Sequence, residues 1–163
     1  MKRRASGVLL PIYALPSPHG IGTLGQAAYD FADFLHAAGQ RCWQMLPLGQ
    51  TGFGDSPYQS FSSFAGNPYF IDLDLLVEDG LLTKDEADAC CARTDPRYVD
   101  YGRLYTERYA VLQKAFQRGR DRDREAIERF QRENTPWISD YADFMALKDR
   151  FDGRPWTQWP EPF

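Results

Sequence analysis

A strand–helix–strand pattern over residues 7–48 constrains the fold more than any other feature. The apolar run 7–10 stops at Pro11 and is typical of a strand buried on both faces of a parallel sheet. Apolar residues spaced three and four apart predict a helix that Gly39 ends. A second apolar run, residues 42–48, predicts another buried strand. This order forms a βαβ unit, which implies a parallel pair with a right-handed crossover.

Two T-x-x-[QE] patterns predict where helices begin. Thr23 and Gln26 are spaced as a capping box at the start of the first helix. Thr83 and Glu86 have the same spacing and predict a short helix that runs to about Ala92.

The second half of the chain is predicted to be mainly helical. Three sets of apolar residues at helical spacing mark three helix faces: Tyr105, Tyr109, Leu112 and Phe116; Ile127 and Phe130; and Tyr141, Phe144, Leu147 and Phe151. Two βα units followed by several helices are unusual for a complete small domain, because a two-stranded parallel sheet leaves its edges and faces uncovered. The pattern predicts an α/β fold in which part of a barrel (residues 1–73) is interrupted by a helical insertion (residues 74–163).

Composition and charge exclude several classes of function. The net charge is −4, and the acids and bases alternate in residues 118–125, so no positive field would attract nucleic acid. No apolar run reaches the roughly 20 residues that span a bilayer, and a cytoplasmic protein is expected. The spacing of the three cysteines (Cys42, Cys90 and Cys91) suits neither a disulfide framework nor zinc. Without a G-x-G-x-x-G pattern or a Walker lysine, no nucleotide cofactor is expected.

Residues 49–69 form a long segment of unusual composition directly after the second predicted strand. They contain five aromatic residues and almost no charge besides Asp55. Disordered segments have few aromatics, so we expect an ordered loop. In α/β proteins, ligands bind at the carboxyl ends of parallel strands, where this loop begins.

The most specific stretch of this loop is GFGDSPYQS at residues 52–60. Asp55 and Ser56 offer hydrogen-bonding groups beside the aromatic face of Tyr58, a mixture that suits sugar rings and their hydroxyls. The alternative interpretation is a stiff turn in which Asp55 or Ser56 caps backbone amides. Asn67 precedes a proline, which indicates a turn residue, with contact to a ligand as the second possibility.

No catalytic residue is predicted within this chain. Retaining glycoside chemistry needs two carboxyl groups about 5 Å apart. The only acids near the loop are Asp55, Asp72 and Asp74, and none has an obvious partner at a neighbouring strand end. His19, in a turn rich in proline and glycine, could face a ligand, although a single loop histidine usually does not.

A long, ordered series of motifs resembles the opening of the amylomaltases, a family of bacterial 4-alpha-glucanotransferases. The matching segments are SGVLL (6–10), SPHGIGTLG (17–25), WQMLPL (43–48), TGFGDSPYQSFS (51–62), FAGNPYFIDL (64–73), VDYG (99–102), DYADFMALK (140–148) and WTQWP (156–160). The resemblance covers essentially the whole chain.

The resemblance implies a (β/α)₈ barrel of the α-amylase type with helical insertions. It implies a retaining mechanism in which an Asp attacks the sugar, a Glu acts as acid and base, and a second Asp orients the ring. In the family these acids lie in barrel segments beyond Phe163. Ser56 and Tyr58 match positions on the acceptor side of the glucan cleft, and Asp55 also matches the family motif. Maltooligosaccharides and α-1,4-glucans are therefore the expected partners.

Two other hypotheses stay open. The chain could be an α-glucan-binding module without chemistry, or a helical interaction protein whose aromatic residues all lie in a core. Titration with maltoheptaose would distinguish the binding module, since half a cleft should bind only weakly. Tryptophan fluorescence that does not respond to any maltooligosaccharide would favour the interaction protein.

Overall fold

The computed structural model describes residues 4–52 and 54–160, so Phe53 of the predicted loop motif lies outside the described residues. The chain divides into two compact units, Met1–Gly119 and Arg120–Phe163. Each unit is described by itself below.

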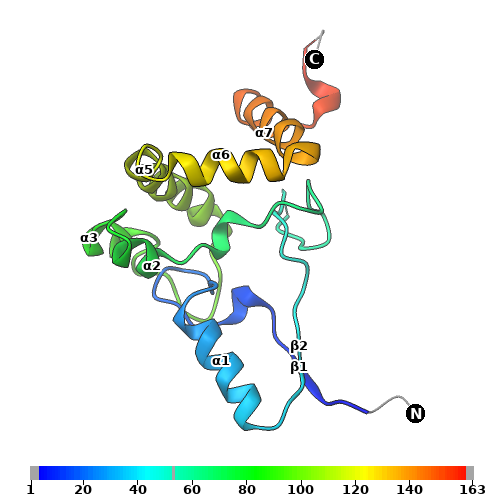
Figure 1. Ribbon diagram of the computed structural model, residues 1–163, viewed down its shortest axis with the longest axis vertical. Helices are drawn as coiled ribbons and strands as arrows, with labels where there is room; N and C mark the ends of the chain where they lie inside the picture. Colours follow the sequence, from blue (N-terminus) through cyan, green and yellow to red (C-terminus); the bar gives the residue numbers. More distant parts are fainter. Residues whose placement is uncertain (1–3, 53, 161–163) are drawn as a thin grey trace. The chain divides into compact units, whose positions relative to one another are not determined.

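The first unit contains the predicted βαβ arrangement. Strand β1 (Gly7–Leu9) pairs in parallel with β2 (Cys42–Gln44), with Gly7 opposite Cys42 and Leu9 opposite Gln44. Helix α1 (Gln26–Ala37) connects the two strands (Figure 1). The predicted parallel pair with an intervening helix is confirmed.

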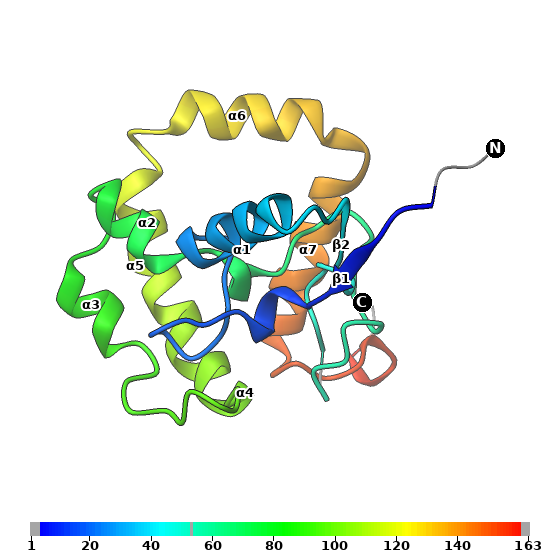
Figure 2. The same cartoon turned by 90° about the horizontal axis from the view of Figure 1, so that it is seen from below.

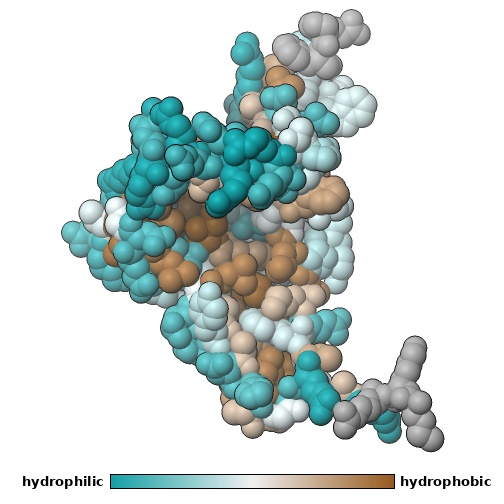
Figure 3. Space-filling view, viewed as in Figure 1, coloured by the Kyte–Doolittle hydropathy of each residue, from teal (hydrophilic) through white to brown (hydrophobic). Residues whose placement is uncertain are grey.

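The predicted burial of the strands is wrong. Both strands have three residues, shorter than the expected runs 7–10 and 42–48, and Leu9 is 54% exposed. The described sheet has two strands, so no further strand covers its outer edges or adds side chains to its faces. Val8 and Leu9 of β1 are consequently exposed, and Figure 3 shows that apolar residues, in brown, reach the surface on the face that it draws.

The predicted capping box at the start of α1 is also wrong. Gly25 occupies the N-cap position, and no side chain caps the helix there. The Thr23 hydroxyl donates instead to the Asp72 carboxylate, a tertiary partner 49 residues further along the chain. The predicted end of the helix is confirmed, since α1 stops at Ala37 and Gly39 follows with φ of +69°.

Helices from the middle of the chain complete the first unit (Figure 2). They are α2 (Leu73–Glu78), α3 (Lys84–Ala89), α4 (Tyr101–Arg103), a π-helix (Leu104–Arg108) and α5 (Tyr109–Gly119), with short 3₁₀ helices at Ile12–Ala14 and Pro68–Phe70. The predicted capping box of Thr83 and Glu86 is confirmed, although α3 ends before Ala92.

One hydrophobic core joins the early and the later segments of this unit. Its buried members are Ile12, Leu15, Ile21, Ala28, Tyr69, Phe70, Leu73, Leu82, Ala87, Cys90, Cys91, Leu104, Val111 and Ala115. Residues on both sides of position 73 therefore fold together, and the compact unit continues to Gly119.

The second unit consists of α6 (Arg124–Glu133), α7 (Thr135–Arg150) and a 3₁₀ helix (Trp156–Gln158). None of its described residues is fully buried. Its main cluster is aromatic, with the Trp159 ring 5.7 Å from Phe144 and 5.5 Å from Phe151 between centroids. The unit thus rests on helix hydrogen bonds and ring contacts instead of an enclosed core.

Candidate functional site

The loop after β2 is held closed at its base. Single antiparallel bridges join Gly49 to Gly66 and Thr51 to Ser60. The Asn67 amide also donates to the Leu48 carbonyl at 2.8 Å. The two arms of the loop therefore run side by side away from the end of the sheet.

Two tight turns form the tip of this loop. The Asp55 amide donates to the Gly52 carbonyl at 3.1 Å, and the Gln59 amide donates to the Ser56 carbonyl at the same distance. Ser56 Oγ also accepts a bond from the Tyr58 amide, at 3.4 Å. The Tyr58 side chain is 73% exposed. The turn therefore presents an aromatic ring to solvent with the Ser56 hydroxyl two residues away.

Asp55 has a constrained backbone and a partly buried carboxylate. Its φ of +53° lies in the left-handed region, which aspartate tolerates better than most residues. Burial raises the pKa of this carboxyl above its ordinary value. Burial and then the charge of Asp55 raise the pKa of Tyr69 to about 12, and the same two causes raise the pKa of Tyr101. The charge of Asp55 thus disfavours ionisation of the Tyr69 and Tyr101 hydroxyls.

Asn67 has the structural role that its position before Pro68 indicated. It is buried, and its Oδ1 accepts a hydrogen bond from the Tyr69 amide at 3.0 Å. It thereby caps the 3₁₀ helix Pro68–Phe70. Contact between Asn67 and a sugar remains a prediction.

The other acids near the loop are engaged in structural contacts. Asp72 caps α2 by accepting from the Leu75 amide at 3.1 Å, and it also accepts from the Thr23 hydroxyl. Asp74 accepts from Lys84 Nζ at 2.9 Å. His19 is fully buried and its Nε2 lies 3.1 Å from Asp74 Oδ2, so this histidine links its turn to α2 and does not face a ligand.

The ion pairs of Asp74 lead to a prediction on the pH dependence of stability. The hydrogen bond from Lys84, and less strongly the one from His19, hold the pKa of Asp74 below its ordinary value of 3.8. A carboxyl with a lowered folded-state pKa stabilises the fold above its unfolded pKa, and this contribution is lost as the pH falls through the folded value. We expect Asp74→Asn to lower the urea midpoint at about pH 7 and to have little effect at about pH 2.

The matched control for this experiment is Asp33→Asn, at an exposed position on α1. It should leave the difference between the two pH values unchanged. An equal deficit of Asp74→Asn at both pH values would contradict the ion-pair explanation.

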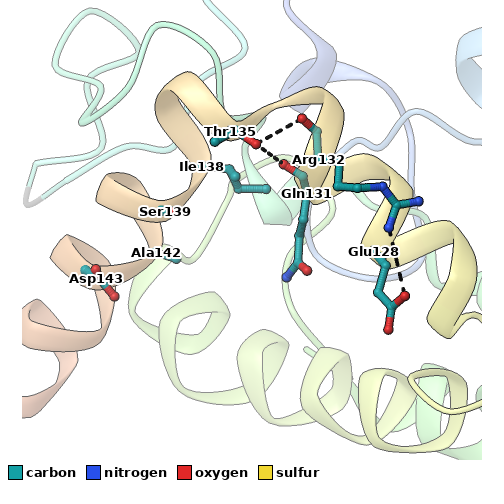
Figure 4. A pocket seen from close by; sticks show the side chains of 8 residues that line it. All are labelled: Glu128, Gln131, Arg132, Thr135, Ile138, Ser139, Ala142 and Asp143. Carbon is teal, nitrogen blue, oxygen red and sulfur yellow. Dashed lines mark hydrogen bonds and ion pairs between the residues drawn. The ribbon is translucent and has the colours of Figure 1, made fainter.

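A separate hollow of about 610 Å³ lies between α6 and α7 (Figure 4). Its lining is Glu128, Gln131, Arg132, Thr135, Ile138, Ser139, Ala142 and Asp143. The Thr135 hydroxyl donates to the Gln131 and Arg132 carbonyls at 3.1 and 2.9 Å, so it mainly closes the junction of the two helices. The hollow contains none of the residues predicted to bind sugar.

Within the part of the chain that the structure describes, no group of three or more His, Cys, Asp or Glu residues could hold a metal ion. No described helix has both the length and the apolar character to cross a membrane.

Arg108 is the residue near the loop that the sequence analysis missed. It lies on the π-helix, is fully buried, and donates to the backbone just after the loop. The predicted face of this helix is wrong, because Tyr105 and Phe116 are exposed and the buried residues are Leu104, Arg108, Val111 and Ala115. The available signal was the spacing of Arg108 from Leu104 and Val111, four and three residues away.

Nearly the whole of this chain is similar to known proteins. A model of the 4-alpha-glucanotransferase family matches residues 10–163. A 4-alpha-glucanotransferase of Streptococcus pneumoniae is 49% identical over 162 residues, and one of Thermus thermophilus is 48% identical over 163 residues. The solved structure of amylomaltase from Streptococcus agalactiae in complex with acarbose superimposes with a TM-score of 0.92 at 44% identity.

The matches cover very different shares of this chain and of its relatives. They cover 98–99% of this chain, but the chain spans only 32% of the length of each of these three proteins. Both the sequence match and the fold are therefore shared over the whole described segment. The chain belongs to the 4-alpha-glucanotransferase family.

Proposed function

We propose that this chain supplies the acceptor side of the glucan cleft in a 4-alpha-glucanotransferase that transfers α-1,4-glucan segments between maltooligosaccharides. The observation that carries the proposal is the exposed Tyr58 ring beside Ser56, on an ordered turn after the carboxyl end of β2. The relatives are named for this activity, and one solved relative holds acarbose.

The geometry of the turn suits a sugar acceptor. An aromatic face packs against the apolar C–H face of a pyranose, and the Tyr58 ring is exposed enough to make this contact. The Ser56 hydroxyl can exchange its local bond for one to a sugar hydroxyl. The bridges at the loop base keep the turn in place, which lowers the entropy lost on binding.

The chemical step is assigned to residues outside this chain. In the retaining mechanism, one carboxylate forms a covalent glycosyl intermediate and another carboxyl group acts as acid and then base. Asp72 and Asp74 are engaged in a helix cap and in ion pairs. We assign the catalytic acids to the part of the relatives' length that this chain does not span.

The proposal also includes the expected barrel segments, the supporting residues of the site and the metabolic role. Residues 1–73 would form the first segment of an α-amylase-type (β/α)₈ barrel, and residues 74–163 a helical insertion. Asp55 and Asn67 would support the sugar site that Ser56 and Tyr58 form. A cytoplasmic enzyme of maltose or glycogen metabolism fits these substrates.

Substitution of Tyr58 tests the proposed acceptor site. In a transferase that carries this segment, Tyr58→Ala should lower kcat/KM for the acceptor about 5- to 30-fold, because losing one aromatic contact costs about 1–2 kcal/mol. Tyr58→Phe keeps the ring and should have a much smaller effect. Initial rates of maltooligosaccharide transfer at varied acceptor concentration measure both.

Tyr29→Ala is the matched control, since this tyrosine is also exposed but lies on α1. Unchanged acceptor kinetics in Tyr58→Ala, or an equal loss in Tyr29→Ala, would rule out Tyr58 as an acceptor contact.

A non-catalytic α-glucan-binding module is the second candidate. The observation that favours it is the presence of the exposed aromatic turn in a chain whose neighbouring acids are occupied. Titration of this chain with maltoheptaose distinguishes the two, because a part of a cleft should bind only weakly and a true module should saturate.

A further inference from the structure

Arg108 is a fully buried cation that binds backbone instead of a carboxylate. Its Nη2 donates to the Tyr69 carbonyl at 3.2 Å and to the Ile71 carbonyl. The thiol of Cys90 is a further polar neighbour of the guanidinium. Arg108 Nε and Nη1 are buried without a hydrogen-bond partner among the described residues, so the two bonds from Nη2 are the ones that tie the π-helix to the Tyr69–Ile71 backbone.

The residue after Arg108 fastens the other arm of the same loop. The Tyr109 hydroxyl accepts a hydrogen bond from Gln50 Nε2 at 2.8 Å, and Gln50 is buried. The Tyr109 ring also lies 5.6 Å from the Tyr69 ring between centroids. Two consecutive residues therefore hold Gln50, near the start of the loop, and the Tyr69–Ile71 backbone, just after residue 67.

The two residues that reach the loop stand at the end of a π-helix. Segments of this type are short, rare and frequently found at functional sites. Here the π-helix Leu104–Arg108 ends where α5 begins at Tyr109. Arg108 at its last position and Tyr109 at the first position of α5 contact opposite arms of the loop base.

We propose that Arg108 is a positioning residue that fixes the loop 49–67, and with it the turn of Ser56 and Tyr58, relative to the end of β2. Tyr109 assists through Gln50, and we call these contacts of Arg108 and Tyr109 the clamp. The role of the clamp in acceptor binding rests on the proposed function, whereas its role in holding the loop does not.

Amide hydrogen exchange of this chain tests the clamp without any glucan. We expect Arg108→Met to raise exchange at residues 54–66 at least about tenfold over the change at α3, because the loop base opens locally. Arg108→Lys keeps one donor and the charge and should restore part of the protection. Lys114→Met on the exposed side of α5 is the control and should leave the loop amides unchanged.

The outcomes separate a positioning role from a general stabilising role. A uniform rise in exchange across the whole first unit, or no rise in the loop, would overturn the proposal. If Arg108→Met does not fold, Tyr109→Phe removes only the hydroxyl that accepts from Gln50. Faster exchange in the loop at an unchanged urea midpoint would then support the clamp, and unchanged loop exchange would refute it.

A parallel titration keeps this test distinct from that of the proposed function. Maltoheptaose should protect the amides around Ser56 and Tyr58 in the unmodified chain and do so less in Arg108→Met. Absence of any effect in the unmodified chain would count against the glucan site alone, because the exchange difference between the variants does not depend on a ligand.

Discussion

Leu73→Ala should lower the free energy of unfolding of the first unit by about 3 kcal/mol, within the usual range for a buried leucine. Leu73 is completely buried at the start of α2, directly after the capping residue Asp72. It belongs to the core that joins residues before and after position 73. Removing its side chain leaves a cavity in the only core that the described residues of this unit form. Urea denaturation followed by far-ultraviolet circular dichroism measures the loss.

Leu75→Ala provides a control within the same helix. Its side chain is 38% exposed, so we expect a loss of about 1 kcal/mol or less. Both variants should keep the slope of the denaturation curve, since neither changes the area exposed on unfolding appreciably. Equal losses in the two variants would show that the early and late segments do not share a core at Leu73.

The parts of this fold that the sequence predicts are those with local causes. The order β1, α1 and β2 follows from apolar runs of different period, and the end of α1 follows from a glycine at positive φ. The capping box of α3 was predicted because Thr83 and Glu86 bond each other's backbone within one turn. No partner elsewhere in the chain is needed to form it.

The predictions that were wrong depend on contacts between distant residues. Thr23 and Gln26 have the right spacing for a cap, but the Thr23 hydroxyl binds Asp72, which belongs to α2. Strand burial depends on how many strands the sheet has, which an apolar run does not encode.

The candidate site shows the same division. The turn of Ser56 and Tyr58 follows from a short motif, and the capping role of Asn67 follows from the proline after it, whereas their contact with sugar stays a prediction. The clamp by Arg108 could not, because a lone arginine at a core position of a helix usually reaches solvent with its charged end. Only the position of the backbone from Tyr69 to Ile71 turns its guanidinium into an internal donor.

Gly22→Ala should be the most damaging small substitution in the turn before α1, with an expected loss of about 3 kcal/mol or failure to fold. A Cβ at this position would lie 2.0 Å from the Ile12 carbonyl oxygen and 2.8 Å from both the nitrogen and the oxygen of Leu15. These are backbone atoms of Ile12 and Leu15, two buried residues at the start and the C-cap of the 3₁₀ helix, and the Gly22 amide donates to the Tyr13 carbonyl at 3.2 Å. No side-chain rotation can relieve the overlap, so the two segments must separate.

Gly66→Ala gives the comparison that isolates this effect. A Cβ at Gly66 would meet no atom within 4 Å, and its backbone does not have the positive φ that favours glycine. Its substitution should therefore change the free energy of unfolding by no more than about 0.5 kcal/mol. Thermal or urea unfolding of the two variants decides the question. If Gly22→Ala were as stable as Gly66→Ala, the glycines of the HGIG turn would not be required for close packing, and a role in binding would have to explain them instead.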